Sequence, residues 1–125
     1  MADAGERYVD ALASKDTAAL LDLFAGNVVF RAMTPGRFWE ARSPDDAVQQ
    51  ILYKWFEPTD LIEGVESFEA GVVVDRARVD YRFRVRNNDG LFAVEQRAYL
   101  ELDGDGRISR MNVICSGYRR LAAQS

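Results

Sequence analysis

The stretch RVDYRFRVR at residues 78–86, followed by NNDG at 87–90, decides how the second half of this chain folds. Apolar and charged side chains alternate strictly through 78–86, which is the period of a β-strand with one buried face. The Asn, Asp and Gly residues that follow are typical of a tight hairpin turn. The segment 91–102 is therefore predicted to be the antiparallel partner of 78–86.

This turn also predicts which residues lie opposite each other. Centring it on Asn88-Asp89 places Tyr81 opposite Gln96 on one face of the sheet. Opposite-charge pairs then fall together on the other face: Arg82 with Glu95, Asp80 with Arg97, and Arg76 with Glu101. The turn was placed without reference to these pairs, so they support the register independently.

A second turn, DGDG at 103–106, leads into a last predicted strand at 107–118. Centring it on Gly104-Asp105 pairs Ala98 with Met111, Gln96 with Val113, and Val94 with Cys115. Both hairpins give the same sidedness. The predicted inner face is Val79, Tyr81, Phe83, Val85, Val94, Gln96, Ala98, Leu100, Met111, Val113 and Cys115. The outer face carries the charges together with Tyr99, Ile108 and Ile114.

The first half of the chain is predicted to be mostly helical. Residues 6–25 contain two helical pieces, with Asp16 capping the second and Gly26-Asn27 ending it. A third helix begins at Ser43, the N-cap, and stops before Pro58. Its buried stripe is Val48, Ile51, Leu52, Trp55 and Phe56. Helices first and strands later predict an α+β fold with an antiparallel sheet.

The remaining segments are predicted to be strands, turns and loops. Residues 28–33 form a strand, and Thr34-Pro35-Gly36 forms a turn. Residues 61–74 form one strand or two, with bends or bulges at Gly64 and Gly71. A turn follows at Asp75-Arg76. The tail, 119–125, is expected to be loose.

Length and composition limit the classes of function. The 125 residues fit one domain, 1–125, with a net charge of −4, one cysteine and no histidine. The acidic balance argues against nucleic acid as a partner, and the lack of histidine removes the commonest general base and metal ligand. No apolar run could span a membrane, and the polar segment 1–7 does not resemble a secretory signal. DGDG matches only the start of a calcium loop. We expect a cytoplasmic protein with no metal and no cofactor.

Two segments of the chain resemble a known family. The opening, RYVDAL at 7–12 with Asp16 and LLDLFA at 20–25, is similar to that of ketosteroid isomerases and other SnoaL-like proteins. So is the ending, DGDGRI at 103–108 followed by a final strand. The resemblance covers nearly the whole chain. It implies the nuclear-transport-factor-2-like (NTF2-like) fold, a cone-shaped roll in which three N-terminal helices pack on a curved, mostly antiparallel sheet around an apolar pocket.

The resemblance carries over few catalytic residues. Tyr8 falls where a helix-one tyrosine of the steroid isomerases donates a hydrogen bond to the substrate oxyanion. Their two catalytic aspartates fall on Ala32 and Ala98, so that reaction is not expected. Limonene epoxide hydrolases use an Asp-Arg-Asp set, of which RVD at 78–80 is superficially similar. The register places its aspartate on the outer face, and the other carboxylate position falls on Val113.

A pocket is expected between the inner sheet face and the helices. Its predicted lining is Tyr8, Phe30, Trp39, Trp55, Tyr81, Phe83, Gln96, Met111, Val113 and Cys115. Tyr8 could donate to a ligand oxygen or be a core tyrosine bonded to a neighbour. Tyr81 and Gln96 could hold a polar group of a ligand or satisfy each other. The aromatic residues could equally be core.

Two reactive side chains also have competing interpretations. Cys115 points inward and is either a nucleophile or an inert core residue, and the chain has no histidine to activate it. Glu40, within FWE at 38–40, is either a base with a raised pKa or a solvated loop glutamate.

Three functions remain open from the sequence. The first is a pocket protein for a small, largely apolar molecule, with isomerase-, cyclase- or dehydratase-type catalysis as one option. The second is a non-catalytic binding protein with the same pocket, which the missing carboxylates favour. The third is an interaction module whose pocket is filled by Trp55, Phe56 and Phe83. Tyr99, Ile108 and Ile114 on the outer sheet face further predict a homodimer.

Overall fold

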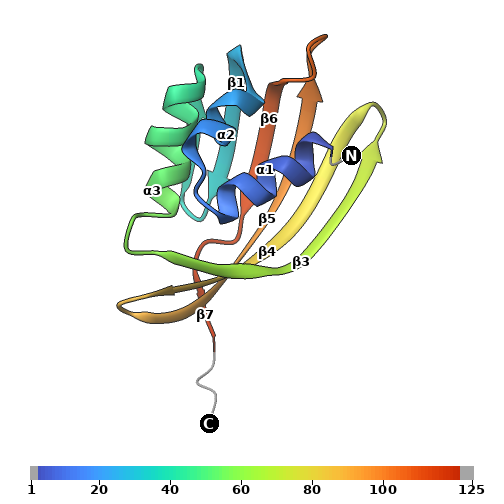
Figure 1. The fold of residues 1–125 in the computed structure, drawn as a ribbon. Coiled ribbons are helices and arrows are strands. Elements are labelled where there is room, and N and C mark those ends of the chain that lie inside the picture. The colour runs from blue at the N-terminus through green and yellow to red at the C-terminus, as the bar shows by residue number, and fades with distance from the viewer. Residues whose placement is uncertain (1–2, 122–125) are drawn as a thin grey trace.

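The computed structural model describes residues 3–121, in which helices pack on one side of a curved sheet (Figure 1). The helical segments are α1 (Ala4–Ala13), α2 (Thr17–Leu23) and a third helix made of η1 (Asp46–Leu52) and α3 (Tyr53–Trp55). The strands are β1 (Phe24–Thr34), β2 (Arg37–Ala41), β3 (Leu61–Val73), β4 (Arg76–Asn87), β5 (Gly90–Leu102), β6 (Ile108–Cys115) and β7 (Arg119–Arg120). The predicted α+β class is confirmed.

The sheet has the order β2-β1-β6-β5-β4-β3, with β7 paired to β5. Only β1 and β6 run parallel among the strand pairs of the described residues, so the sheet is mostly antiparallel, as predicted. The parallel pair joins the N-terminal strand to the C-terminal one. Within residues 3–121, no helix combines the length and the apolar character needed to cross a membrane.

The first two helices begin with aspartate caps. Asp3 accepts the backbone N–H of Glu6, and Asp16 accepts that of Ala19, as predicted for Asp16. The predicted end of the second helix at Gly26-Asn27 is wrong, because the chain becomes extended at Phe24 and enters β1 there. Phe24 is buried and lies opposite Ile108 of β6, so sheet pairing prevails over helix propensity at this point.

The third helix begins at the predicted residue, but its first part has a larger radius than an α-helix. The Ser43 hydroxyl accepts the backbone N–H of Asp46. Through η1 the helix is of the π type, and the N–H of Tyr53 bonds to the carbonyl of Val48, five residues back. The predicted stripe is buried in full: Val48, Ile51, Leu52, Trp55 and Phe56.

The first hairpin has the predicted register. Tyr81 lies opposite Gln96, and Arg82 lies opposite Glu95. Gly90, at φ 128°, has a conformation that glycine adopts without strain. The tight-turn chemistry of NNDG is therefore sufficient to set the pairing of β4 with β5.

The predicted register of the second hairpin is shifted by two residues. Cys115, rather than Val113, lies opposite Gln96, and the register of the β5–β6 pairing shifts between Glu101 and Leu102. One residue of the shift comes from the turn, which is centred later than predicted because the N–H of Asp103 bonds to the carbonyl of Arg107. The other residue comes from a β-bulge between Glu101 and Leu102. A shift of two keeps each side chain on its face, so the predicted inner residues remain inside.

The same bulge moves Ile108 to the other face. It was predicted on the outer face, yet it is fully buried. Ile114, beyond the bulge, is 55% exposed on the outer face as predicted. Because the bulge inserts one residue into the strand, the side chain before it points to the opposite face from the one predicted.

Four smaller predictions are also corrected. FWE at 38–40 belongs to strand β2 rather than to a loop. The β3–β4 turn lies at Val74-Asp75, one residue early. Gly71 pairs regularly with Arg78. The register shifts in β3 lie instead between Ile62 and Gly64 and between Val65 and Ser67. The first residues of the expected loose tail form β7 on β5, and residues 122–125 lie outside the described residues.

Helix α1 crosses the inner face of the sheet at close range. A Cβ on Gly5 would collide with a methyl group of Val79 on β4, so this position needs a glycine for packing. The close approach brings the next turn of α1, which carries Tyr8, onto the strands. The inner face of β4, β5 and β6 is buried beneath the helices.

Candidate functional site

Three strands contribute a connected row of polar side chains to the buried face. The Tyr81 hydroxyl of β4 donates to Oε1 of Gln96 on β5 at 2.5 Å. Nε2 of Gln96 donates to Sγ of Cys115 on β6 at 3.2 Å. Tyr81 and Gln96 therefore satisfy each other, one of the two alternatives open from the sequence. Cys115 joins them only because of the actual β5–β6 register, which the sequence analysis did not anticipate.

Tyr8 of α1 lies over this row. Its ring is 6.2 Å from that of Tyr81, at an interplanar angle of 64°. Its hydroxyl is buried and makes no hydrogen bond of standard geometry among residues 3–121, but it lies close enough to the Tyr81 hydroxyl for the two groups to interact. Burial raises the pKa of both phenols above its usual value, so both carry their protons at neutral pH. Tyr8 is thus a neutral buried phenol beside the Tyr81 hydroxyl, which itself donates to Gln96.

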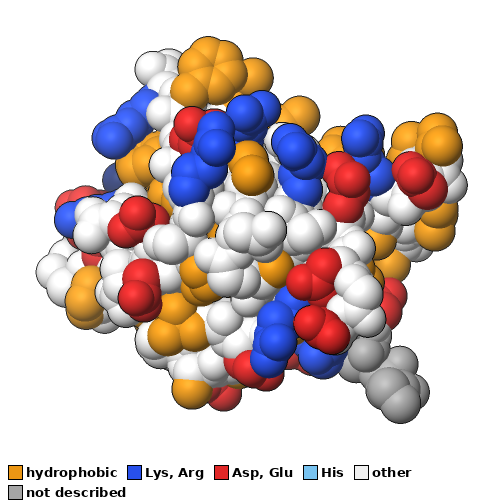
Figure 2. Space-filling model, turned by 90° about the horizontal axis from the view of Figure 1, so that it is seen from above, with side chains coloured by type: hydrophobic (Ala, Val, Ile, Leu, Met, Phe, Trp, Pro, Cys, Tyr) orange, Lys and Arg blue, Asp and Glu red, His pale blue; other side chains and the backbone are white. Residues whose placement is uncertain are grey.

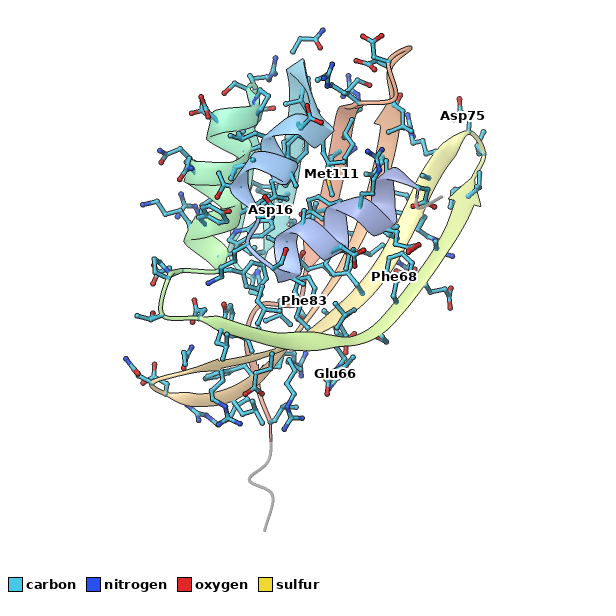
Figure 3. The ribbon with its side chains drawn as sticks, viewed as in Figure 1. Asp16, Glu66, Phe68, Asp75, Phe83 and Met111 are labelled. Carbon is cyan, nitrogen blue, oxygen red and sulfur yellow. The ribbon has the colours of Figure 1, made fainter. Side chains whose placement is uncertain are left out.

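Aromatic rings form a continuous series of contacts through the interior. Successive contacts with ring centroids 5.2–6.4 Å apart run from Trp55 to Phe30, Phe24, Tyr8, Tyr81, Phe83 and Phe56. Phe56 at the end of the series is the chain neighbour of Trp55. We call these seven residues the aromatic circuit. Figure 3 shows Phe83 and Met111 between the helices and the sheet. The circuit offers flat apolar surface with few polar groups.

The residues expected to fill the interior are in contact with one another. The rings of Phe56 and Phe83 are 5.6 Å apart and nearly perpendicular, and both are buried. Phe30, Met111 and Val113 are buried as well. A ligand in this space has to displace at least one aromatic side chain, because protein interiors are close-packed.

The two tryptophans differ in how their indole N–H groups are satisfied. Trp39 of β2 is partly buried, donates to the Thr34 hydroxyl at 2.8 Å, and carries the Arg37 guanidinium 3.6 Å from its ring centroid. Trp55 of α3 is 8% exposed, and within the described residues its indole nitrogen has no acceptor. Their rings are 6.0 Å apart and perpendicular.

Cys115 has the environment of an inert thiol. It is buried, and its sulfur accepts hydrogen bonds from Gln96 and from the backbone N–H of Gly117. Burial raises its pKa, and the two hydrogen bonds only partly offset this. A neutral thiol is a poor nucleophile, so the geometry favours the structural interpretation of Cys115.

Glu40 lies on the outer face and forms ion pairs. Its carboxylate is 2.8 Å from Nε of Arg31 and 3.4 Å from Arg42. The hydrogen bond from Arg31, assisted by the charge of Arg42, lowers its pKa. The alternative of a base with a raised pKa is therefore wrong, because two cations stabilise the ionised form.

The described core contains one buried carboxylate, Asp60, which the sequence analysis missed. Its two oxygens accept the backbone N–H of Glu57 and the side-chain amide of Asn87, each at 2.9 Å. The Lys15 ammonium donates to the main-chain carbonyls of Glu57 and Asp60. This cluster ties the end of the third helix to the β4–β5 turn. Its engaged carboxylate fits a structural role.

The outer face of β3, β4 and β5 carries paired charges. Arg82 contacts Glu95 at 2.9 Å and Glu66 at 3.1 Å, and Asp80 pairs with Arg78 and Arg97. Figure 2, a view from above, shows several basic and acidic side chains side by side. Asp80 therefore points away from the interior, as predicted, and no epoxide-hydrolase-like set forms around it.

A surface depression of about 480 Å³ lies on the outer face of β2, β1 and β6. Apolar side chains at it are exposed, with Phe38 at 79% and Met33 at 46%, beside Ile114. Ile114 was predicted on the outer face. Phe38 was missed because β2 was interpreted as a loop, and Met33 was not assigned to a face although the strand at 28–33 was predicted. We call Met33, Phe38 and Ile114 the outer patch.

Neither a family model nor a curated protein matches the sequence. Solved structures do match in fold. A protein from Rhodopseudomonas palustris assigned as an isomerase has a TM-score of 0.72 at 12% identity, over 94% of this chain and 92% of that one. A protein from Catenulispora acidiphila with a ketosteroid isomerase-like fold, bound to trimethylamine, has a TM-score of 0.69 at 16% identity, over 90% and 85%.

A protein from Shewanella putrefaciens, named as similar to SnoaL-like polyketide cyclases, has a TM-score of 0.64 at 13% identity, over 90% of this chain and 87% of that one. These neighbours share the NTF2-like fold, and this chain has that fold too. The resemblance predicted from its opening and ending is confirmed at the level of the fold. At such identities the likeness does not extend to activity.

Proposed function

We propose that this protein binds a small, largely apolar molecule with a neutral oxygen acceptor, between the inner face of the sheet and the helices. The observation that carries the proposal is the buried Tyr8 hydroxyl, which makes no hydrogen bond of standard geometry among residues 3–121. Leaving such a donor unmatched costs about 1–3 kcal/mol, which an acceptor on a ligand would recover. The aromatic circuit supplies the apolar surface that such a molecule needs, and at least one of its rings has to turn aside to admit the ligand.

The inner face favours binding over catalysis. Ala32 and Ala98 occupy the positions of the steroid isomerases' aspartates, and both are buried. Glu40 lies outside, and Asp60 is fully engaged. Nothing that could act as a general base near neutral pH faces Tyr8 from the described elements of the inner face. The structural neighbours named as an isomerase and as cyclase-like proteins support a small molecule as the partner.

Mass spectrometry of compounds that co-purify with the protein tests the proposal directly. We expect an apolar compound with a carbonyl, ether or hydroxyl oxygen, retained by the wild type and reduced about tenfold in Tyr8→Phe. Phe keeps the ring and removes only the donor. Equal retention by the two proteins, or none by either together with no thermal stabilisation by apolar ketones, would refute it.

A second candidate function is self-association, which the outer patch favours. Exposed apolar side chains that lie together mark interaction surfaces. We propose that two copies pack through the outer sheet face, which would cover Phe38 and Ile114. Light scattering should then give the mass of a dimer, and Phe38→Arg should shift it toward the monomer. A wild-type monomer at high concentration would exclude this assembly.

A further inference from the structure

Strand β3 has an edge that no other strand covers within residues 3–121. The sheet ends at β3, which pairs only with β4, and Figure 1 shows it along one border of the molecule. It runs over 13 residues, which is longer than most strands. An open strand edge presents backbone N–H and C=O groups that pair readily with another chain, and proteins protect such edges with bulges and charges.

The two halves of β3 differ in this protection. Both of its register shifts lie before Ser67. The second half, 67–73, pairs with β4 without interruption and contains one charged residue, Glu69. Its apolar side chains are exposed, with Val72 at 72% and Phe68 at 39%. This half therefore lacks the features that keep strand edges from pairing.

The β3–β4 turn determines which backbone groups point to the free edge. Val73 and Arg76 flank a two-residue turn, so they exchange backbone hydrogen bonds with each other. Because bonded and non-bonded pairs alternate along an antiparallel ladder, the backbone groups of Phe68, Ala70 and Val72 point away from β4. The free edge thus offers donors and acceptors at every second residue.

A second copy of the same strand fits this edge in one register. Two identical strands pair antiparallel about a twofold axis, which has to pass through a residue if opposed side chains are to share a face. An axis at Glu69 would place two carboxylates against each other. An axis at Ala70 places Phe68 opposite Val72 of the second copy, and pairs of aromatic and β-branched side chains stabilise sheets. An axis at Gly71 loses this pair.

The same register brings opposite charges together on the outer face. A Cβ on Gly71 would lie 2.5 Å from Nη2 of Arg78, so this guanidinium lies over Gly71 and next to the free edge. With the axis at Ala70, Glu69 lies opposite Gly71 of the second copy. The Glu69 side chain is 75% exposed and therefore free to reach the Arg78 of the other copy. The contact is neutral and sets no like charges opposite each other.

We propose that a second copy of this protein pairs with β3 through residues 68–72, antiparallel about Ala70, so that the sheet continues from one copy into the next. This contact lies at the opposite border of the sheet from β2 and is separate from the outer patch. It is also independent of the proposed ligand. Copies that used both contacts would form assemblies larger than a dimer.

Site-directed cross-linking tests the register. Cys115→Ser removes the single native cysteine, and Ala70→Cys then adds one exposed thiol. A residue on the axis lies about 5.5 Å from its own copy, within reach of a bis-methanethiosulfonate reagent that joins two thiols through one carbon. Ser67→Cys is the matched control, because its two copies would be about 20 Å apart. We expect a covalent dimer from Ala70→Cys and none from Ser67→Cys.

Four cross-linking results would overturn the proposal. Absence of a product from Ala70→Cys would show that the strands do not meet, and equal products from both variants would indicate random collisions. A product from Val72→Cys in preference to Ala70→Cys would move the axis and separate the proposed pairs. Loss of the Ala70→Cys product when Phe38→Arg is added would mean that the copies meet only through the outer patch.

The proposed ion pair has a control on the same strand. Glu63 also lies beside arginines of its own chain, Arg84 and Arg86, but outside the paired segment. We expect Glu69→Gln to lower the yield of the Ala70→Cys product about threefold, because two exposed ion pairs are lost. Glu63→Gln should leave the yield unchanged. Equal yields from the two variants would contradict the register.

Hydrogen exchange tests the proposal in the wild-type protein. The backbone N–H groups of Phe68, Ala70 and Val72 should exchange more slowly as the protein concentration rises, since only a second copy protects them. Those of Glu69 and Gly71, which bond to β4, should be protected at every concentration. Slow exchange of the first three that is independent of concentration would mean that the same chain covers the edge. Fast exchange at every concentration would mean that nothing does, and either result overturns the proposal.

Discussion

The two faces of strand β4 accommodate their polar side chains in opposite ways. On the inner face Tyr81 sits between Val79 and Phe83, and its hydroxyl is hydrogen-bonded to a single neutral partner, Gln96. On the outer face Asp80 and Arg82 are only partly buried and contact several charged neighbours. Residues one position apart therefore differ in burial, charge and number of partners.

This difference indicates where stability and recognition reside. Burying a large apolar side chain contributes several kcal/mol, whereas an exposed ion pair contributes about 0–1 kcal/mol. The inner face has few polar groups, and most of them are paired. Among residues 3–121 the hydroxyl of Tyr8 and the indole N–H of Trp55, on the helices that cover this face, make no hydrogen bond of standard geometry. The outer face has many polar groups that neutralise one another. Substitutions on the two faces should therefore have effects of different size.

The largest effect is expected from Phe83→Ala. Phe83 is fully buried and packs against Phe56 and Tyr81, so truncation should lower the free energy of unfolding by about 3–5 kcal/mol. Urea denaturation monitored by circular dichroism measures this, with Phe83→Leu expected to fall in between. A loss below about 1 kcal/mol would show that the inner face is loosely packed at this point.

A smaller effect is expected when the buried hydrogen bond is broken. Tyr81→Phe should cost about 1–3 kcal/mol, because the Gln96 carbonyl then stays buried without its donor. Gln96→Leu should cost a similar amount, and the double variant less than the sum of the two. Unfolding free energies of the four proteins form a double-mutant cycle. Strict additivity would mean that the two side chains do not interact.

On the outer face Arg82→Ala should have little effect. Arg82 forms ion pairs with Glu66 and Glu95, but all three side chains are partly exposed. The expected loss is about 0–1 kcal/mol, and it should shrink as salt is raised from low concentration toward 1 M. Thermal melts over a salt series provide the measurement. A loss that is large and independent of salt would contradict the comparison of the two faces.

The smallest effect is expected at Glu40, and it depends on pH. Its pKa is lowered below the usual 4.5, so its ionised form favours the folded state. That contribution is complete above the unfolded pKa and is lost as the pH falls through the lower, folded pKa. Unfolding measured from pH 7 to pH 3 should show wild type and Glu40→Gln converging in stability as the pH falls. A difference that grows toward low pH would refute the assignment.

The sequence predicted the first hairpin better than the second for a local reason. NNDG fixes the turn between β4 and β5 because Gly90 adopts a positive φ and the Asn87 side chain accepts the backbone N–H of Asp89. DGDG allows a longer turn, and the step near Leu102 follows from the burial of Ile108 under distant helices. Strand β2 was missed because its five residues gain their order from pairing with β1, which their own pattern does not reveal.

The candidate site was only partly predictable. All the side chains predicted for the inner face of β4, β5 and β6 are buried, because strict alternation determines sidedness. The link from Gln96 to Cys115 depends on the bulge and could not be derived from the pattern. Neither could the unmatched N–H of Trp55, because whether a donor finds an acceptor depends on side chains from other elements.

By itself, the sequence determined the α+β class, the faces of the strands and the position of the first turn, because these follow from local periodicity and turn chemistry. Only the tertiary structure decided the parallel pairing of β1 with β6, the burial of Ile108 and the partners of the polar groups. Those features join residues far apart in the chain, and the close packing of helices on the sheet selects among arrangements that the local pattern leaves equally open.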